Sequence, residues 1–133
     1  MTDLQFLRKS QGALFGEFYL DFRTMELSRG DQTVRLTLLE FKVLKFLVSR
    51  PRVVISRQKL IGSAWPKRKR SSYRTVDNCI AKLRQKIEVN PDRPVFIRTV
   101  QGMGYKFVPL EELRPLADPA EEESSEKKWE SDL

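Results

Sequence analysis

One stretch, Ser72–Glu88, sets the strongest limit on how this chain can fold. Its aliphatic residues recur four, three and four positions apart, which predicts a helix with one face packed on a core. At about 100° per residue, the other face carries Arg74, Thr75, Asn78, Ala81, Lys82 and Gln85. Amides can pair with adenine and cations with guanine, so this face suits the edges of DNA bases. A merely solvated helix face is the simpler alternative, and the rest of the chain must decide between them.

The charge of the chain is unevenly distributed. The formal net charge is +7, but residues 111–133 contain nine Asp and Glu against three Lys and Arg, which leaves +13 on residues 1–110. A body this basic favours a polyanionic partner, either nucleic acid or an anionic membrane surface. No apolar run approaches the ~20 residues of a membrane span and no signal-peptide pattern is present, so nucleic acid is favoured and no membrane partner is expected.

The chain contains a single Cys, Cys79, and no His. These counts exclude a disulfide framework and the usual zinc sites, and we expect no metal and no cofactor. No constellation of nucleophile, acid and base stands out, so nothing supports an enzyme. A reducing cytoplasm is the simplest compartment for such a chain.

The first half of the chain reads as a small sheet followed by a helix. Strands are predicted from Gly16 to Thr37, with a turn at Arg29–Asp31, as an antiparallel sheet with one buried face. Thr37 and Glu40 form a capping box that starts a helix ending near Arg50. Apolar residues cover most of this helix, so we expect it to be the scaffold of the core.

Two further helices and a hairpin follow. Ser56 caps a short helix that reaches about Ala64, and a basic loop then leads to the helix at about 73–88. Two strand patterns flank a tip with two glycines, which permit positive φ, so residues 96–108 are predicted to form a β-hairpin. The predicted class is α+β, with a linker or disordered lead-in at 1–13, one domain at 14–110 and an acidic disordered tail at 111–133.

This order of elements is that of a winged helix-turn-helix, and the chain resembles one family from about Phe15 to Val108. The family is the C-terminal effector domain of OmpR/PhoB-type two-component response regulators. Five landmarks agree in order and spacing, and together they are a strong signal: Leu36-Thr37-x-x-Glu40-Phe41-x-x-Leu44, Val54-Ile55-Ser56-Arg57-x-x-Leu60, Trp65, Arg74-Thr75-Val76-Asp77-x-x-Ile80-x-x-Leu83-Arg84-x-Lys86-Ile87 and Thr99-Val100-x-Gly102-x-Gly104-Tyr105-x-Phe107.

The resemblance implies sequence-specific binding of double-stranded DNA for transcription regulation. In the family the third helix enters the major groove, and the hairpin wing reaches the adjacent backbone or minor groove. Base contacts are then expected from Thr75, Asn78, Cys79, Lys82 and, by its place on the helix, Gln85. Backbone contacts are expected from Trp65, Arg74, Arg84, Lys86, Arg98, Thr99, Gln101, Tyr105 and Lys106. The helical wheel gives Asn78 and Lys82 independently and places Cys79 nearer the core boundary.

Three positions depart from the family pattern. Cys79 stands where His is common, and Ala81 and Gln101 stand where Arg is common. A neutral amide is not drawn into the negative minor groove as Arg is. We therefore expect either weak readout by the wing or anchoring of the wing on phosphates by Arg98 and Lys106. Asp77 would repel DNA, so its expected role is an internal ion pair or hydrogen bond.

The resemblance also implies partners. Such domains bind direct repeats as head-to-tail dimers, and the loop between the second and third helices contacts RNA polymerase. That loop carries Lys67, Arg68, Lys69 and Arg70, whose charge also suits the DNA backbone. The receiver domain of the phosphorelay is not found in these 133 residues. The chain is then either an excised effector domain or a free-standing regulator. In the first case a receiver domain in cis is possible; the initiating Met1 favours the second.

One alternative to DNA binding stays open at this point. A winged-helix protein–protein module without DNA binding would use the basic loop on an acidic partner.

The acidic tail has two candidate roles. It would act only in solubility or, in a second hypothesis, would compete with DNA for the basic face. For DNA binding we expect Lys82→Ala to reduce discrimination at one base pair and Arg84→Ala to weaken all sequences alike.

Overall fold

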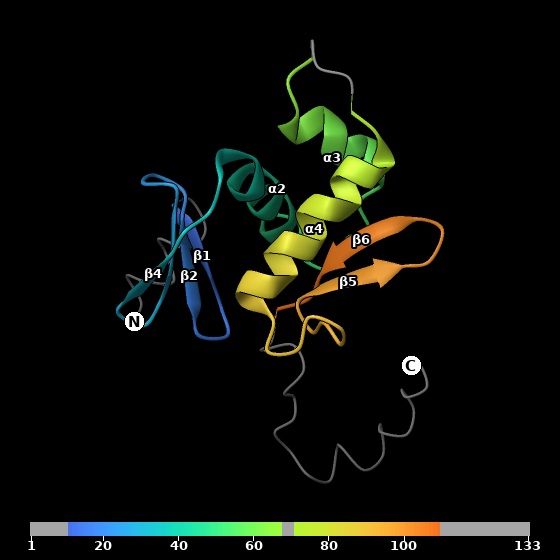
Figure 1. Cartoon of the computed structure of the whole chain (residues 1–133). Coiled ribbons are helices and arrows are strands. Elements are labelled where there is room, and N and C mark those ends of the chain that lie inside the picture. Colours follow the sequence, from blue (N-terminus) through green and yellow to red (C-terminus); the bar gives the residue numbers. More distant parts are fainter. Residues whose placement is uncertain (1–10, 68–70, 110–133) are drawn as a thin grey trace, which may run out of the picture.

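The computed structural model describes residues 11–67 and 71–109. A four-stranded antiparallel sheet comes first, in the order β1 (Gly12–Phe15), β2 (Phe18–Asp21), β3 (Glu26–Arg29) and β4 (Gln32–Val34). Three helices follow, α2 (Leu38–Val48), α3 (Arg57–Ala64) and α4 (Tyr73–Ile87), and then the hairpin of β5 (Ile97–Val100) and β6 (Gly104–Phe107). In Figure 1 the sheet and the hairpin lie on opposite sides of the helices. The predicted α+β winged helix-turn-helix is confirmed.

The strand β1 is the one element that the sequence did not predict. It pairs with β2 so that Gly12 lies opposite Asp21 and Phe15 opposite Phe18. Gly12 and Ala13 therefore belong to the sheet and not to the lead-in. The segment has no alternation of polar and apolar residues, and its glycine argues against a strand. Residues 1–10 and 110–133, which cover most of the expected lead-in and the acidic tail, lie outside the described residues.

Side chains at the helix starts satisfy backbone groups that the helices leave unpaired. At α2 the Glu40 amide donates to Thr37 Oγ1 at 3.1 Å, and the Thr37 amide donates to Glu40 Oε1 at 2.9 Å. The hydroxyls of Ser56 and Ser72 accept backbone N–H groups in the first turns of α3 and α4. Such caps each stabilise a helix by about 1 kcal/mol. The predicted starts of all three helices are confirmed.

The core is built around α2. Val43, Leu44 and Leu47 are fully buried, and both α3 and α4 pack on this helix. An aromatic cluster ties the sheet to the base of the hairpin: the Phe15 ring meets those of Phe96 and Phe107 edge to face, each at 5.1 Å between centroids. Such geometry is favourable for aromatic pairs. Among the described helices none is long and apolar enough to cross a bilayer.

Candidate nucleic-acid interface

The helix α4 has two chemically different faces. Val76, Ile80 and Leu83 are fully buried, which fixes the rotation of the helix about its axis. The opposite face is exposed at Arg74, Asn78, Ala81, Lys82 and Gln85, with Thr75 partly buried beside them. We call these six residues the α4 edge. It presents two cations, two amides and one small side chain to solvent, in the arrangement that the sequence predicted.

The hairpin stands beside α4 as a wing (Figure 1). Gln101, Gly102 and Met103 form its exposed tip, where Gly102 adopts a φ of 75°. Gly104 opens β6 with a φ of 148°, and a Cβ atom there would lie 2.1 Å from the carbonyl oxygen of Ile55. The Ile55 and Tyr105 backbones exchange two hydrogen bonds of 2.8 and 3.0 Å. The link between α2 and α3 therefore holds the base of the wing.

Asp77 connects α3, α4 and the wing. Its Oδ1 accepts from Arg57 Nε at 2.8 Å and from the Tyr105 hydroxyl at 2.5 Å. Burial pushes the pKa of Asp77 upward, but these two hydrogen bonds outweigh it and hold the pKa below its usual value. Burial and the bond to Asp77 raise the pKa of Tyr105 to about 12. The expected internal role of Asp77 is confirmed.

Arg84 fastens the wing to α4 from within the domain. Its Nε and Nη2 donate to the carbonyl of Ile97 at 3.0 and 2.8 Å, and Nη2 also donates to Thr99 Oγ1 at 2.9 Å. The guanidinium carbon lies 5.5 Å from the centre of the Tyr105 ring. Arg84 was expected to bind phosphate, but most of its donors already have partners. Its replacement would loosen the wing in addition to removing a charge.

Lys86 does not project toward the α4 edge. Its Nζ donates to Glu40 Oε1 at 2.6 Å and to the carbonyl of Arg35 at 2.9 Å. Burial pushes the pKa of the buried Glu40 upward, but hydrogen bonds from Lys86 and the Thr37 backbone, together with the charges of Lys86 and Lys82, hold it below its usual value. Lys86 was expected to contact the DNA backbone. In the structure Lys86 instead neutralises a carboxylate inside the domain.

Three predicted contact residues are buried: Trp65 is 8%, Cys79 6% and Tyr105 4% exposed. Cys79, from which a base contact was expected, has its thiol enclosed by the core, where burial raises its pKa to about 11. Tyr105 has its hydroxyl committed to Asp77. For Cys79 the helical wheel was the better guide than the family pattern.

On the wing, the residues that were predicted to contact the DNA backbone remain at least partly exposed to solvent. Thr99 and Gln101 are exposed, and Arg98 and Lys106 are half-buried. The Arg98 side chain is braced by a hydrogen bond from its Nε to the carbonyl of Val95 at 2.9 Å. These four residues all lie on one hairpin.

Glu88 is a structural residue that sequence reasoning missed. It is buried, and its carboxylate accepts from the backbone amides of Val95, Phe96 and Ile97 at 2.7 to 3.1 Å. These bonds close the loop between α4 and β5 and so set where the wing begins. No local pattern signals this role, because the donors lie seven to nine residues further along the chain.

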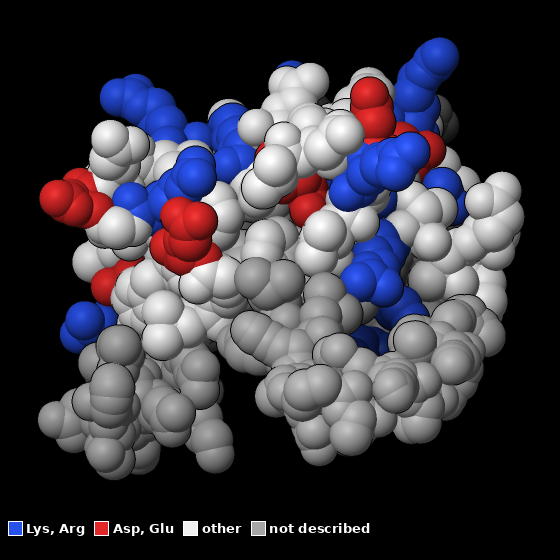
Figure 2. All heavy atoms as spheres, turned by 90° about the horizontal axis from the view of Figure 1, so that it is seen from below, with Lys and Arg blue, Asp and Glu red and all other residues white. Residues whose placement is uncertain are grey.

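Basic charge is not spread evenly over the surface. On the face shown in Figure 2, Lys and Arg side chains are interspersed with Asp and Glu. The α4 edge by contrast carries Arg74 and Lys82 and no acidic residue. Of the four cations of the basic loop only Lys67 is described, and Arg68, Lys69 and Arg70 lie outside the described residues. Within the described ranges no group of three His, Cys, Asp or Glu could hold a metal ion.

Comparison with known proteins gives consistent matches. The family described as "Transcriptional regulatory protein, C terminal" matches residues 31–107. The transcriptional regulatory protein AfsQ1 of Streptomyces coelicolor is 35% identical over 100 residues, which are 75% of this chain and 44% of AfsQ1. This chain thus spans less than half the length of the curated relatives it matches first.

Two solved structures share the fold. The response regulator DrrB of Thermotoga maritima, described as an OmpR/PhoB homologue, is 31% identical with a TM-score of 0.69, over 78% of this chain and 48% of DrrB. The DNA-binding domain of RstA from Klebsiella pneumoniae, solved in complex with the RstA box, is 28% identical with a TM-score of 0.64, over 74% of this chain and 97% of that domain.

Proposed function

Since the chain belongs to the OmpR/PhoB-type family of transcriptional regulatory domains, we propose that it binds double-stranded DNA sequence-specifically and thereby regulates transcription. The observation that carries this proposal is the α4 edge, an exposed row of amides and cations held in place by a buried aliphatic face. In the proposed complex α4 lies in the major groove, and the wing lies on the adjacent backbone or minor groove. The RstA neighbour, which was solved on its DNA box, supports this arrangement.

The proposal divides the contact residues into two groups. Thr75, Asn78, Lys82 and Gln85 face base edges, and Ala81 leaves room for close approach. Backbone contacts come from Arg74 on α4 and from Arg98, Thr99, Gln101 and Lys106 on the wing. Backbone contacts supply affinity that depends on salt, whereas base contacts supply discrimination. Cys79, Lys86 and Tyr105 are left out, because their polar groups are buried or already paired.

The proposal is tested by selecting bound duplexes from a random pool and measuring affinities by fluorescence anisotropy. Lys82→Ala is expected to lose about 1–3 kcal/mol of discrimination at one base pair, because a specific base partner is removed. Lys42→Ala, which removes an exposed lysine of α2 outside the α4 edge, is the matched control. A uniform loss across all sequences would contradict the base contact of Lys82. Absence of any bound duplex would refute DNA binding itself and favour the protein–protein module.

Finer parts of the proposal come from the family. We infer that two copies bind direct repeats head to tail, that the loop between α3 and α4 contacts RNA polymerase, and that the domain works in the cytoplasm. Control by a phosphorylated receiver domain in cis belongs to the same proposal, because DrrB, named a response regulator, extends well beyond the matched region. The spacing of half-sites in the selected duplexes tests the dimer, since one helical turn or a multiple is expected.

A further inference from the structure

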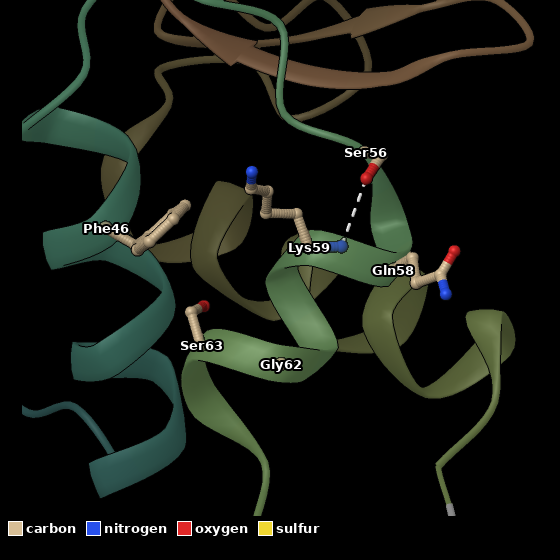
Figure 3. Close-up of a pocket in the computed structure, with 6 residues that line it drawn as sticks. All are labelled: Phe46, Ser56, Gln58, Lys59, Gly62 and Ser63. Atoms are coloured by element: carbon tan, nitrogen blue, oxygen red, sulfur yellow. Dashed lines mark hydrogen bonds between the residues drawn. The ribbon is translucent and has the colours of Figure 1, made fainter.

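A groove runs along α2 and α3 and takes no part in the proposed DNA contact. It consists of two adjoining hollows that share Phe46 and Ser63. We call it the α2–α3 groove. The hollow in Figure 3 is completed by Ser56, Gln58, Lys59 and Gly62. The other is completed by Met25, Leu38, Phe41, Lys42, Lys45, Ser49 and Arg50.

The floor of the groove is apolar and partly open to solvent. Leu38 is 56% and Met25 44% exposed, although both are large apolar side chains. In Figure 3 the Phe46 ring points from α2 toward α3. Leu38, Lys42, Lys45 and Ser49 follow one another on α2 at spacings of four, three and four residues, so they lie along one face of the helix. Exposed apolar surface of this kind, rimmed by polar groups, is typical of interaction sites.

The charged residues on the rim of the groove are basic. Lys42, Lys45, Arg50 and Lys59 line it, and among the described residues no Asp or Glu lines either hollow. The cations rest on aromatic rings: the Arg50 guanidinium lies 3.7 Å from the Phe46 ring centre and the Lys45 Nζ 5.1 Å from that of Phe22. None of the four forms an ion pair with another described residue. Their charge is therefore available to a partner.

The groove and the α4 edge lie on different sides of the domain. No residue that lines either hollow belongs to α4 or to the wing. In Figure 3, which looks into the hollow, the α4 ribbon runs behind α3. A ligand in the groove would therefore leave the α4 edge open to DNA.

We propose that the α2–α3 groove binds an acidic amphipathic helix of a partner protein, and that it does so while the α4 edge is occupied by DNA. Apolar side chains repeating every three or four residues on that helix contact Leu38, Phe46 and Met25, as in other helix-in-groove complexes. Its carboxylates pair with Lys42, Lys45 and Lys59, whose uniform sign selects an acidic partner over a basic one.

The test uses a fluorescein-labelled synthetic peptide of about four helical turns, with Leu on one face and Glu elsewhere. We expect saturable binding in anisotropy titrations, weakening several-fold when salt is raised. Lys42→Glu is expected to weaken binding about tenfold. Gly62→Gln is expected to weaken it as well, because a side chain there enters open space in the groove. Arg93→Glu, the same charge change at an exposed position outside the groove, is the control and should have no effect.

Several outcomes would overturn the proposal. Absence of saturable binding, equal binding of the same peptide with Lys in place of Glu, or equal weakening by Arg93→Glu would show that the groove does not recognise an acidic helix. Displacement of the peptide by a bound duplex would show that the two faces are not independent. Tighter binding of a peptide of residues 111–133 would assign the groove to the chain's own acidic segment. The peptide titration without DNA tests the groove even if the domain does not bind DNA. Failure of the groove proposal can therefore be distinguished from failure of the proposed DNA binding.

Discussion

Two lysines one helical turn apart on α4 show how the environment of a residue decides its role. Lys82 is exposed, whereas Lys86 reaches Glu40 and the Arg35 carbonyl. Glu40 is itself buried and also caps α2. A buried carboxylate that loses its partner is strongly unfavourable. We therefore assign Lys86 to stability and Lys82 to recognition.

Replacement of each lysine by Met separates these roles. Lys86→Met is expected to lower the free energy of unfolding by about 2–4 kcal/mol, because it leaves the Glu40 carboxylate buried without its cation. Lys82→Met should change it by less than about 0.5 kcal/mol, as is usual for an exposed site. Urea unfolding of both variants measures the difference. Equal loss in the two would show that the Lys86–Glu40 pair adds nothing in solution.

The pair should also depend on pH in a defined direction. Folding lowers the pKa of Glu40, so its carboxylate adds stability that is complete above the usual value of 4.5 and is lost as the pH falls through the lower folded pKa. The stability gap between the wild type and Lys86→Met is therefore expected to narrow in acid. A gap that stays constant from neutral pH to about pH 3 would contradict this assignment.

The wing is held to the helices by contacts that converge on its base. Asp77 binds Tyr105, Arg84 binds Ile97 and Thr99, and Glu88 binds the amides before and at the start of β5. Gly104 lets β6 approach the Ile55 backbone closely. Together these contacts set the position of the wing relative to α4, on which simultaneous contact with DNA depends.

Two glycines should respond oppositely to replacement by Ala. Gly104→Ala is expected to destabilise the domain by about 3 kcal/mol, because Cβ would clash with the Ile55 carbonyl at an unfavourable φ. Gly62→Ala, within α3 and facing open space, should stabilise it by about 0.5–1 kcal/mol through helix propensity. Thermal unfolding followed by circular dichroism measures both. A Gly104→Ala domain as stable as the wild type would mean that the wing can separate from Ile55 without cost.

For the whole molecule, charge placement matters more than net charge. Residues 1–110 carry +13, but charges of both signs mix on the face in Figure 2. The proposed interface uses four cations: Arg74, Lys82, Arg98 and Lys106. Only cations that reach phosphates release counterions. Lys82 is assigned to a base edge, so Arg74, Arg98 and Lys106, and not the total charge, should determine the salt dependence of binding.

The salt dependence of DNA binding gives the corresponding measurement. For one domain on duplex DNA, the slope of log K against log salt is expected to be about −3, from about 0.9 for each phosphate that Arg74, Arg98 and Lys106 neutralise. Arg74→Ala should reduce its magnitude by about 1, and Lys86→Met should leave it unchanged at salt where both variants are folded. A slope near zero would favour the protein–protein module over DNA binding.

The elements whose signals are local follow from the amino-acid sequence alone. The caps at Thr37 and Ser56 and the positive-φ glycines of the hairpin depend on chemistry within a few residues, and all appear as predicted. The exposed face of α4 follows equally from helical period. Local chemistry and periodicity together are enough for the element order and hence for the family resemblance.

Which polar groups on those elements stay free depends on how the elements pack against one another. Lys86 meets Glu40 across 46 residues and Tyr105 meets Asp77 across 28, and such partners leave no trace in local sequence. The strand β1 likewise depends on pairing with β2 more than on its own propensity. Burial and pairing are properties of the assembled core. Which residues of α4 serve recognition and which serve support is therefore set only when distant segments pack together.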